Sequence, residues 1–358
     1  MAQTTDKGFT LTKATKAGRA TVKWGSVFLV VFIFGRIMWE AGYAYYKALN
    51  PDPPPPPTQG FGLLPPIAFT NEVGSPRAFS KELATGVFPT FGDRAFVFFM
   101  PQKSPSLLDA DSAKSIARRY DFTALPEILN QTTYRWIRSQ SFSTTLELDI
   151  ITNNFKYHTD YLSHPELILQ AEIPTQFDAV NQVKEFLGTG GLLPADVSSA
   201  SGKITYLRAV GGALKEAVSV SDAQFIQVDI NRVPVGDQYP IYTPDGTTGT
   251  IHAILASGFG TNGVVEMERN YFPVDYTLSH TYPLRTVDEA WSILQAGEGY
   301  IAKAGSDETA VVRDVTLGYF ETLEQQSYLQ PIYVFTGDNG FLGYVPALTT
   351  AAVQATTN

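Results

Sequence analysis

An apolar run followed at once by a proline run constrains this chain more than any other feature. Residues 24–39 carry one charged side chain, Arg36. Extended to residue 46 and rising about 1.5 Å per residue, the run can cross a bilayer core of about 30 Å. We therefore predict a transmembrane anchor over 24–46, with Arg36 reaching toward the interface along its aliphatic stem. The expected lipid-contacting and interfacial side chains are Trp24, Phe28, Phe32, Phe34, Arg36 and Trp39.

The charges before the anchor predict its orientation. Residues 1–23 form a tail with five basic residues and one acidic residue, and the positive-inside rule places such a tail in the cytoplasm. We therefore expect a single-pass protein of the cytoplasmic membrane whose C-terminal domain is extracytoplasmic. A cleaved secretory signal is the alternative, with processing at the Gly-Tyr-Ala of 42–44. Because Arg36, Trp39 and Glu40 crowd that position, a retained anchor is favoured.

The proline run predicts a stiff stalk over residues 47–60. Its prolines are Pro51, Pro53, Pro54, Pro55, Pro56 and Pro57. Their fixed φ angles and missing amides prevent helix and sheet and favour polyproline II, at about 3.1 Å per residue. The stalk is expected to hold the following domain away from the bilayer. A docking site for a proline-binding domain is the alternative.

Charge and composition limit the partners of the exported part. The tail contributes +4 to the net charge of −9, so the remainder carries −13. Nucleic acid is therefore not an expected partner. The chain has no cysteine, which excludes disulfides, thiol chemistry and cysteine-based zinc sites. With 44% hydrophobic residues, the exported part can instead bury a substantial core.

Three short helices are expected after the stalk, each followed by antiparallel strands. The first has Asp109 as a plausible N-cap. The second begins at Pro174 and stops at Gly188. The third carries a capping box between Thr286 and Glu289. The strands are indicated by alternating patterns at 146–150, 155–161, 203–210, 213–220, 223–232, 241–243, 250–255, 264–272, 311–320, 332–335 and 341–345.

These patterns predict an α+β ectodomain of repeated helix plus antiparallel β-hairpin units, with each helix covering one sheet face. We place an N-terminal unit at 61–170 and further units at 171–346. Residues 347–358 are expected to be a disordered tail.

The sequence offers few candidates for chemistry. Residues 258–263 spell GxGxxG, but a strand pattern rather than a helix follows, which favours a hairpin loop over a dinucleotide site. Asp109, Asp111 and Asp121 lie near two arginines, and helix capping explains the first two. The sequon at Asn130 is expected by chance.

Histidines suggest a metal site only weakly. His158 and Asp160 would share a strand face, whereas His164 precedes a proline in a turn. His252 and His280 are distant in sequence. Surface histidines are the favoured interpretation. We therefore predict no catalytic residue, no metal site and no cofactor.

Three segments near the C-terminus carry a family resemblance: TVDEAWSILQAG at 286–297, VTLGYF at 315–320 and LQPIYVF at 329–335. They resemble the closing domain of YycH/YycI-type regulatory proteins, and the resemblance extends more weakly back to residue 174. It implies a bacterial, membrane-anchored accessory protein that binds a membrane sensor kinase and adjusts its activity. It supplies no catalytic residues. The proline stalk and the unit at 61–161 depart from the family pattern.

The leading expectation is a non-enzymatic ectodomain, tethered to the lipid bilayer, that binds another envelope protein in a sensing or regulatory role. The alternative is a structural or ligand-binding envelope protein that holds peptide, glycan or lipid. An exported hydrolase is disfavoured because nucleophile, base and metal constellations are missing.

Overall fold

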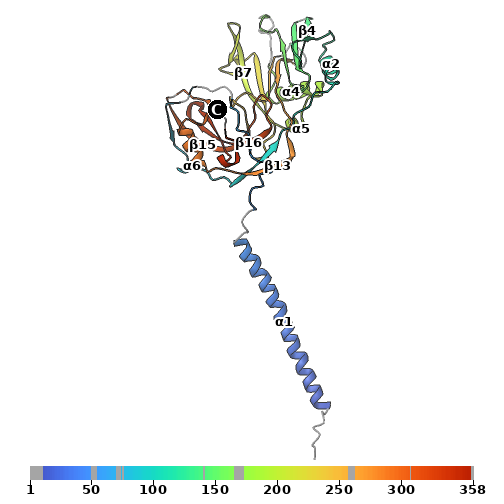
Figure 1. The fold of residues 1–358 in the computed structure, drawn as a ribbon, viewed down its shortest axis with the longest axis vertical. Coiled ribbons are helices and arrows are strands. Elements are labelled where there is room, and N and C mark those ends of the chain that lie inside the picture. The colour runs from blue at the N-terminus through green and yellow to red at the C-terminus, as the bar shows by residue number, and fades with distance from the viewer. Residues whose placement is uncertain are drawn as a thin grey trace, which may run out of the picture. The chain divides into compact units, whose positions relative to one another are not determined.

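The chain divides into two compact units, Met1–Pro56 and Pro57–Asn358. The computed structural model describes residues 11–49, 55–69, 74, 76–139, 142–164, 173–256, 263–306 and 308–355. Where it is described, the first unit consists of one long helix, and the second is α+β with two large, mainly antiparallel sheets (Figure 1).

The N-terminal helix α1 spans Leu11–Leu49, so it begins well before the predicted anchor at residue 24. Its segment Gly18–Lys47 is long and apolar enough to cross a membrane, and none of it is buried by the protein. The five predicted aromatic contacts are all exposed, with Trp39 at 77%. Arg36 Nε lies 3.0 Å from Glu40 Oε1, one helical turn later. The two charged side chains of the predicted anchor, Arg36 and Glu40, therefore form an ion pair one turn apart.

Only part of the predicted stalk lies within the described residues. Pro55, Pro56 and Pro57 have no regular secondary structure. Pro51, Pro53 and Pro54 lie outside the described residues, so the polyproline II conformation stays a prediction there.

The larger sheet has nine antiparallel strands. In spatial order they are β3 (Glu127–Ile128), β4 (Thr133–Ser139), β5 (Ser143–Asp149), β6 (Phe155–Thr159), β12 (Val264–Arg269), β11 (Ile251–Leu255), β9 (Phe225–Ile230), β7 (Gly202–Val210) and β8 (Ala213–Glu216). Alternation along the strands gives this sheet an apolar face under the helices and a mixed face, on which charged residues lie beside a second small core that includes Leu207 and Phe225.

Helices cover the apolar face of the nine-stranded sheet. They are α2 (Asp109–Arg119), α4 (Gln176–Gly190) and the short α5 (Ala195–Ser198). Phe186 of α4 stacks on Tyr120 at a centroid distance of 4.6 Å and contacts Tyr157 of β6 at 5.0 Å. All three rings belong to one buried core with Trp136 and Met267.

The second sheet has eight strands and contains most of the C-terminal region. They are β1 (Ala78–Lys81), β2 (Arg94–Phe99), β10 (Ile241–Tyr242), β13 (Asp275–Pro283), β14 (Tyr300–Lys303), β15 (Thr309–Phe320), β16 (Tyr328–Gly337) and β17 (Leu342–Pro346). Strands β1 and β10 pair with β15 in parallel, and the other pairings are antiparallel. Helix α6 (Val287–Gln295) packs on this sheet through Trp291 and Leu294. Three 3-10 turns complete the described elements: η1 (Val220–Asp222), η3 (Asp338–Gly340) and η4 (Thr350–Ala352).

The strand pairing does not follow the predicted division at 170/171. Strands β1 and β2 come from the expected N-terminal unit but pair with β15, β16 and β13. Strand β6 pairs with β12, more than 100 residues later. The predicted repeat of helix-hairpin units is therefore not confirmed: antiparallel hairpins follow α2, α4 and α6, but long-range pairing combines strands from both predicted units in each sheet.

The C-terminal tail also differs from the prediction. Leu348 and Ala352 are each 1% exposed, and Val353 forms a parallel bridge with Leu64. Residues 347–355 are therefore packed rather than disordered, because their apolar side chains fill a small core with Val97 and Tyr282.

The helix ends are close to those predicted. The capping box of α6 between Thr286 and Glu289 is confirmed. Helix α4 runs past Gly188 and ends before Gly191, which has a left-handed φ of 68°. Asp109 is the first helical residue of α2 rather than its N-cap, and its carboxylate accepts a hydrogen bond from the amide of Ser106 at 2.6 Å.

Candidate interaction face and the ion cluster beside it

A row of charged side chains crosses the mixed face of the nine-stranded sheet, one from every strand except β8. In order they are Lys203, Asp229, His252, Glu268, Lys156, Glu147, Arg135 and Glu127, each directly opposite the next. Along the row, basic groups, among them the imidazole of His252, alternate with acidic groups. Opposite side chains on neighbouring strands have Cβ atoms about 5 Å apart, so every member can interact with both neighbours. We call this row the charge ladder.

Most neighbouring members of the charge ladder are paired. Lys156 Nζ lies 3.0 Å from Glu268 Oε1. Arg135 contacts Glu147 at 2.6 Å and Glu127 at 3.5 Å. The Lys156 side chain is 62% exposed, and those of Arg135, Glu147 and Glu268 are about one-third exposed. Surface pairs of this kind contribute about 0–1 kcal/mol each, so the ladder adds little to stability and defines a surface pattern instead.

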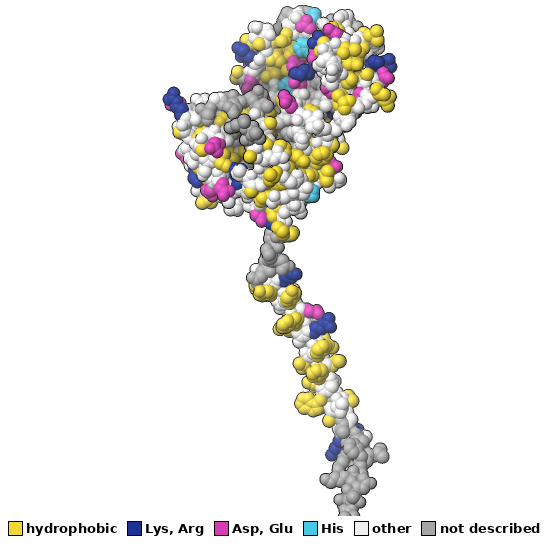
Figure 2. Space-filling model, in the orientation of Figure 1, with side chains coloured by type: hydrophobic (Ala, Val, Ile, Leu, Met, Phe, Trp, Pro, Cys, Tyr) yellow, Lys and Arg dark blue, Asp and Glu magenta, His cyan; other side chains and the backbone are white. Residues whose placement is uncertain are grey.

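The face that carries the ladder is open to solvent only in part: Lys156 is 62% exposed, whereas His252 is 18% and Asp229 4% exposed. Residues that alternate with ladder members, such as Tyr157, Trp136 and Met267, point to the opposite face and are buried under the helices. Figure 2 shows the result as basic, acidic and histidine side chains gathered between hydrophobic ones on the upper part of the molecule, where Figure 1 places β4 and β7.

A second charged pair lies two residues along the same strands from the ladder members Lys156 and Glu268. His158 of β6 is directly opposite Glu266 of β12, with 3.6 Å between Nδ1 and Oε2. The hydroxyl of Tyr161 donates to the same oxygen at 3.3 Å. The interaction with His158 holds the pKa of Glu266 below its usual value, and Glu266 in turn raises the pKa of His158.

His252 is the least exposed basic member of the ladder, at 18%, and is held by Asp229 at 2.8 Å from Nδ1. Asp229 also accepts hydrogen bonds from the amide of Gly249 and the side-chain amide of Gln227. Burial favours neutral His252, but the hydrogen bond and charge of Asp229, with Glu266 and Glu268 nearby, outweigh it and raise the pKa.

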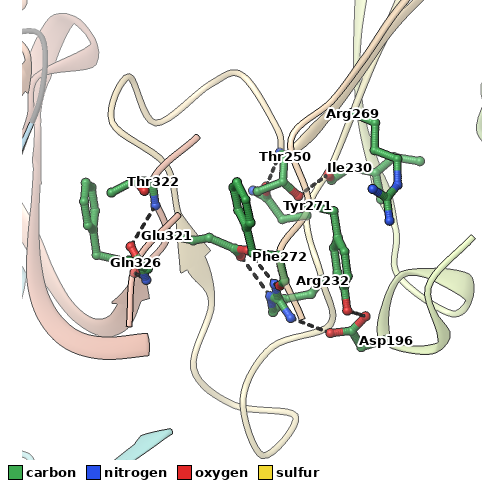
Figure 3. Close-up of polar contacts among 12 residues, drawn as sticks. Asp196, Ile230, Arg232, Thr250, Arg269, Tyr271, Phe272, Glu321, Thr322 and Gln326 are labelled. Atoms are coloured by element: carbon green, nitrogen blue, oxygen red, sulfur yellow. Dashed lines mark hydrogen bonds and ion pairs between the residues drawn. The ribbon is translucent and has the colours of Figure 1, made fainter. Parts of the chain in front are cut away.

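A buried ion cluster joins the two sheets beside this face (Figure 3). Arg232 follows β9 and donates to Glu321, which follows β15, with 2.8 Å from Nε to Oε2. It also donates to Asp196 of α5 at 2.6 Å and to the carbonyl of Phe272 at 2.7 Å. The Arg232 and Glu321 side chains are both fully buried. Burial disfavours the charged guanidinium, but the two carboxylates outweigh it and raise the pKa of Arg232.

Tyr271 lies between two arginines of this cluster. Its ring is 4.8 Å from the guanidinium carbon of Arg232 and 5.1 Å from that of Arg269. Its hydroxyl donates to Asp196 at 2.9 Å, and burial, the main cause, raises the pKa of Tyr271. Burial lowers the pKa of Arg269 to about 10. Because a buried ion pair is costly to separate, the cluster links the ends of β9 and β15, and with them the two sheets.

The structure does not bring together the histidines that were considered as metal ligands. His158 pairs with Glu266, His252 pairs with Asp229, and His280 packs against Phe61 at a centroid distance of 4.6 Å. Among the described residues, no group of three or more His, Asp or Glu could hold a metal ion. Most of the GxGxxG segment lies outside the described residues, but the strand predicted after it is present as β12.

Sequence patterns did not reveal the ion cluster. Arg232 is 89 residues from Glu321 and 36 from Asp196, so no local spacing connects them. The ladder, by contrast, had a signal, because charged residues alternate with apolar ones in β5, β6 and β12. Only the strand register aligns them into one row.

Comparisons with known proteins do not assign a family. No family model matches the sequence, and no curated protein matches it. Among solved structures, the chain is similar to an uncharacterized protein from Eubacterium rectale, with 11% identity, a TM-score of 0.34, and coverage of 72% of this chain and 84% of that one. This similarity is too weak to support a conclusion about fold or function.

Proposed function

We propose that this protein is a non-enzymatic membrane-tethered protein whose extracytoplasmic domain binds another envelope protein, in a sensing or regulatory role. The charge ladder is the observation that carries the proposal. Helix α1 is apolar and long enough to serve as the tether, and the basic tail favours a cytoplasmic N-terminus. The YycH/YycI-like segments make a membrane sensor kinase the first partner to test.

The ladder has the extent and pattern of a recognition surface. Eight strands at about 4.8 Å spacing extend for roughly 34 Å. That length is comparable with the width of a patch of about 800 Å², the area that a standard protein interface buries on each partner. Alternating charges reject partners with the wrong pattern, so they provide specificity more than affinity.

A charge swap separates recognition from folding. In the double variant Lys156→Glu with Glu268→Lys, the internal pair is retained while the pattern presented to a partner is inverted. The matched control is Arg77→Glu with Glu308→Arg, an exposed pair at 80% and 77% that lies outside the ladder. Crosslinking in intact cells, followed by mass spectrometry, should recover a specific protein with the parent and with the control but not with the ladder swap.

Two results would contradict the proposal: no specific protein crosslinked by the parent in repeated trials, or equal recovery by the ladder swap. The alternative function, a ligand-binding envelope protein, is favoured by a separate feature, the aromatic hollow in the second sheet.

A further inference from the structure

A hollow of about 520 Å³ lies between β2, β13, β15 and the loop that precedes β10. Half of its lining residues are aromatic: Phe96, Phe98, Tyr239, Tyr276 and Tyr319. The others are Arg94, Ala95, Val235, Gly236 and Ser279. Its volume is within the range of small-molecule sites, about 300–1,000 Å³. We call it the aromatic hollow.

The five rings form one connected group. Phe98 contacts Phe96, Tyr276 and Tyr319 at centroid distances of 6.1, 5.5 and 5.9 Å, and Tyr319 contacts Tyr239 at 6.3 Å. Phe96 remains 52% exposed and Tyr276 41% exposed. Large rings left open around a concave site are typical of a surface that a ligand covers.

A local irregularity places Tyr276 at the rim. The pairing of β13 with β2 shifts between Asp275 and Ser279, so three residues of β13 have no partner on β2. The Asp275 carboxylate holds this bulge by accepting hydrogen bonds from the Thr277 amide at 2.9 Å and from the Leu278 amide at 3.3 Å. Tyr276 therefore stands on a fixed turn rather than on a mobile loop.

The lining is close to neutral, and the buried charges behind Tyr276, those of Arg232 and Asp196, are paired with each other, so the net charge of the domain is what favours a cation. Arg94 is the one charged residue of the lining, and it donates to Asp93 at 2.8 and 2.7 Å, which offsets its charge. Behind the ring of Tyr276, the hydroxyl donates to Asp196 at 3.4 Å. Residues 57–358 carry a net charge of −13, because residues 1–56 contribute +4 to the total of −9.

We propose that the aromatic hollow binds a small soluble compound with a quaternary ammonium group, such as choline or betaine. The negative faces of aromatic rings attract such cations. A quaternary ammonium donates no N–H hydrogen bond, so a site built mainly of rings can hold it without additional acceptors. This site lies apart from the charge ladder and its proposal does not depend on that of the ladder.

The test uses the full-length protein in a detergent without a choline-type headgroup. Choline and betaine are titrated by calorimetry, and so is the uncharged carbon isostere of choline, in which a tert-butyl group replaces trimethylammonium. Saturable binding is expected, with the isostere at least about tenfold weaker because it lacks the cation–π attraction. Equal binding of the isostere would show a merely apolar hollow and would overturn the proposal, as would no binding of either cation.

Variants locate the binding. Phe96→Leu and Tyr276→Leu should each weaken choline binding about tenfold, whereas Tyr276→Phe keeps the ring and should bind nearly as the parent does. Phe177→Leu is the matched control, since Phe177 is 77% exposed and does not line the hollow. Equal loss in this control, or undiminished binding in both Leu variants, would place the ligand elsewhere and overturn the proposal.

Discussion

Arg232 and Glu321 form an ion pair in which neither side chain reaches solvent, and they follow strands of different sheets, β9 and β15. Separating such a pair leaves a charge in a medium where it cannot be hydrated, which costs far more than the pair itself contributes. The pair therefore stabilises one arrangement of the two sheets, which we call the lock, because any other arrangement would separate the buried charges; it adds little to the overall free energy of folding.

The first prediction concerns this lock. Glu321→Gln keeps the size of the side chain but removes its charge, so Arg232 retains only Asp196 as an ionic partner. We expect a loss of about 3–5 kcal/mol in the free energy of unfolding, measured by urea denaturation of the full-length protein in detergent. Glu308→Gln, in an exposed pair with Arg77, is the control and should leave the unfolding midpoint unchanged.

A double variant distinguishes a lock from ordinary packing. If Arg232→Met and Glu321→Met are combined, the fully buried pair is removed as a unit, and only Asp196, which is 14% exposed and keeps the hydrogen bond from Tyr271, loses its cation; part of the stability lost in Glu321→Gln should therefore return. A double variant less stable than the single one would mean that the cluster contributes through its hydrogen bonds to Phe272 and Asp196 rather than through charge balance.

The second prediction is a dependence of stability on pH. His252 has a pKa raised above 6.5 in the folded state, with Asp229 as the main cause that outweighs burial. Its contribution is therefore fully present below the unfolded pKa near 6.5 and is lost as the pH rises through the folded pKa. His158 acts in the same direction through Glu266. The parent should be less resistant to urea at pH 8 than at pH 6.

The variant His252→Gln tests the assignment. It cannot be protonated, so the difference in unfolding free energy between pH 6 and pH 8 should shrink. His164→Gln is the comparison variant, because His164 contacts the ring of Phe142 at a centroid distance of 5.1 Å and lies outside the charge ladder. If both variants show the parent's pH dependence, the titrating groups lie elsewhere in the protein.

The third prediction compares two glycines. A Cβ atom at Gly249 would lie 2.6 Å from the backbone nitrogen and 2.7 Å from the carbonyl oxygen of Ile230, and backbone atoms cannot move aside. Gly249→Ala should therefore destabilise the protein by about 1–3 kcal/mol. Gly188→Ala in α4 meets no atom within 4 Å and should stabilise by about 0.5–1 kcal/mol. The measurement is the thermal unfolding midpoint of each variant. Equal changes in the midpoint for the two variants would refute the packing argument.

The fourth prediction tests the capping box of α6. The hydroxyl of Thr286 accepts a hydrogen bond from the amide of Glu289 at 3.2 Å. Thr286→Ala should cost about 1 kcal/mol in unfolding free energy, whereas Thr286→Ser should keep most of it because serine supplies the same acceptor. A serine variant as unstable as the alanine variant would indicate that the methyl group, not the cap, matters.

Local patterns predicted elements better than they predicted connections. The alternation of Leu146 and Leu148 with charged residues gave β5, and the stripe through Trp291 gave α6, because one period decides which face is buried. The units at 61–170 and 171–346 are not confirmed as separate units, because strand pairing is not limited to sequence neighbours: β1 pairs with β15 and β2 with β16.

The sequence by itself determined the apolar helix, the absence of cysteine chemistry and the α+β class, since each follows from composition or from a pattern within one segment. The tertiary structure alone decided the alignment of Lys156 with Glu268, the burial of Arg232 against Glu321 and the gathering of Phe96, Tyr239 and Tyr276 around one hollow. These relationships join residues far apart in the chain, and they depend on register and on packing between sheets, which no local period encodes.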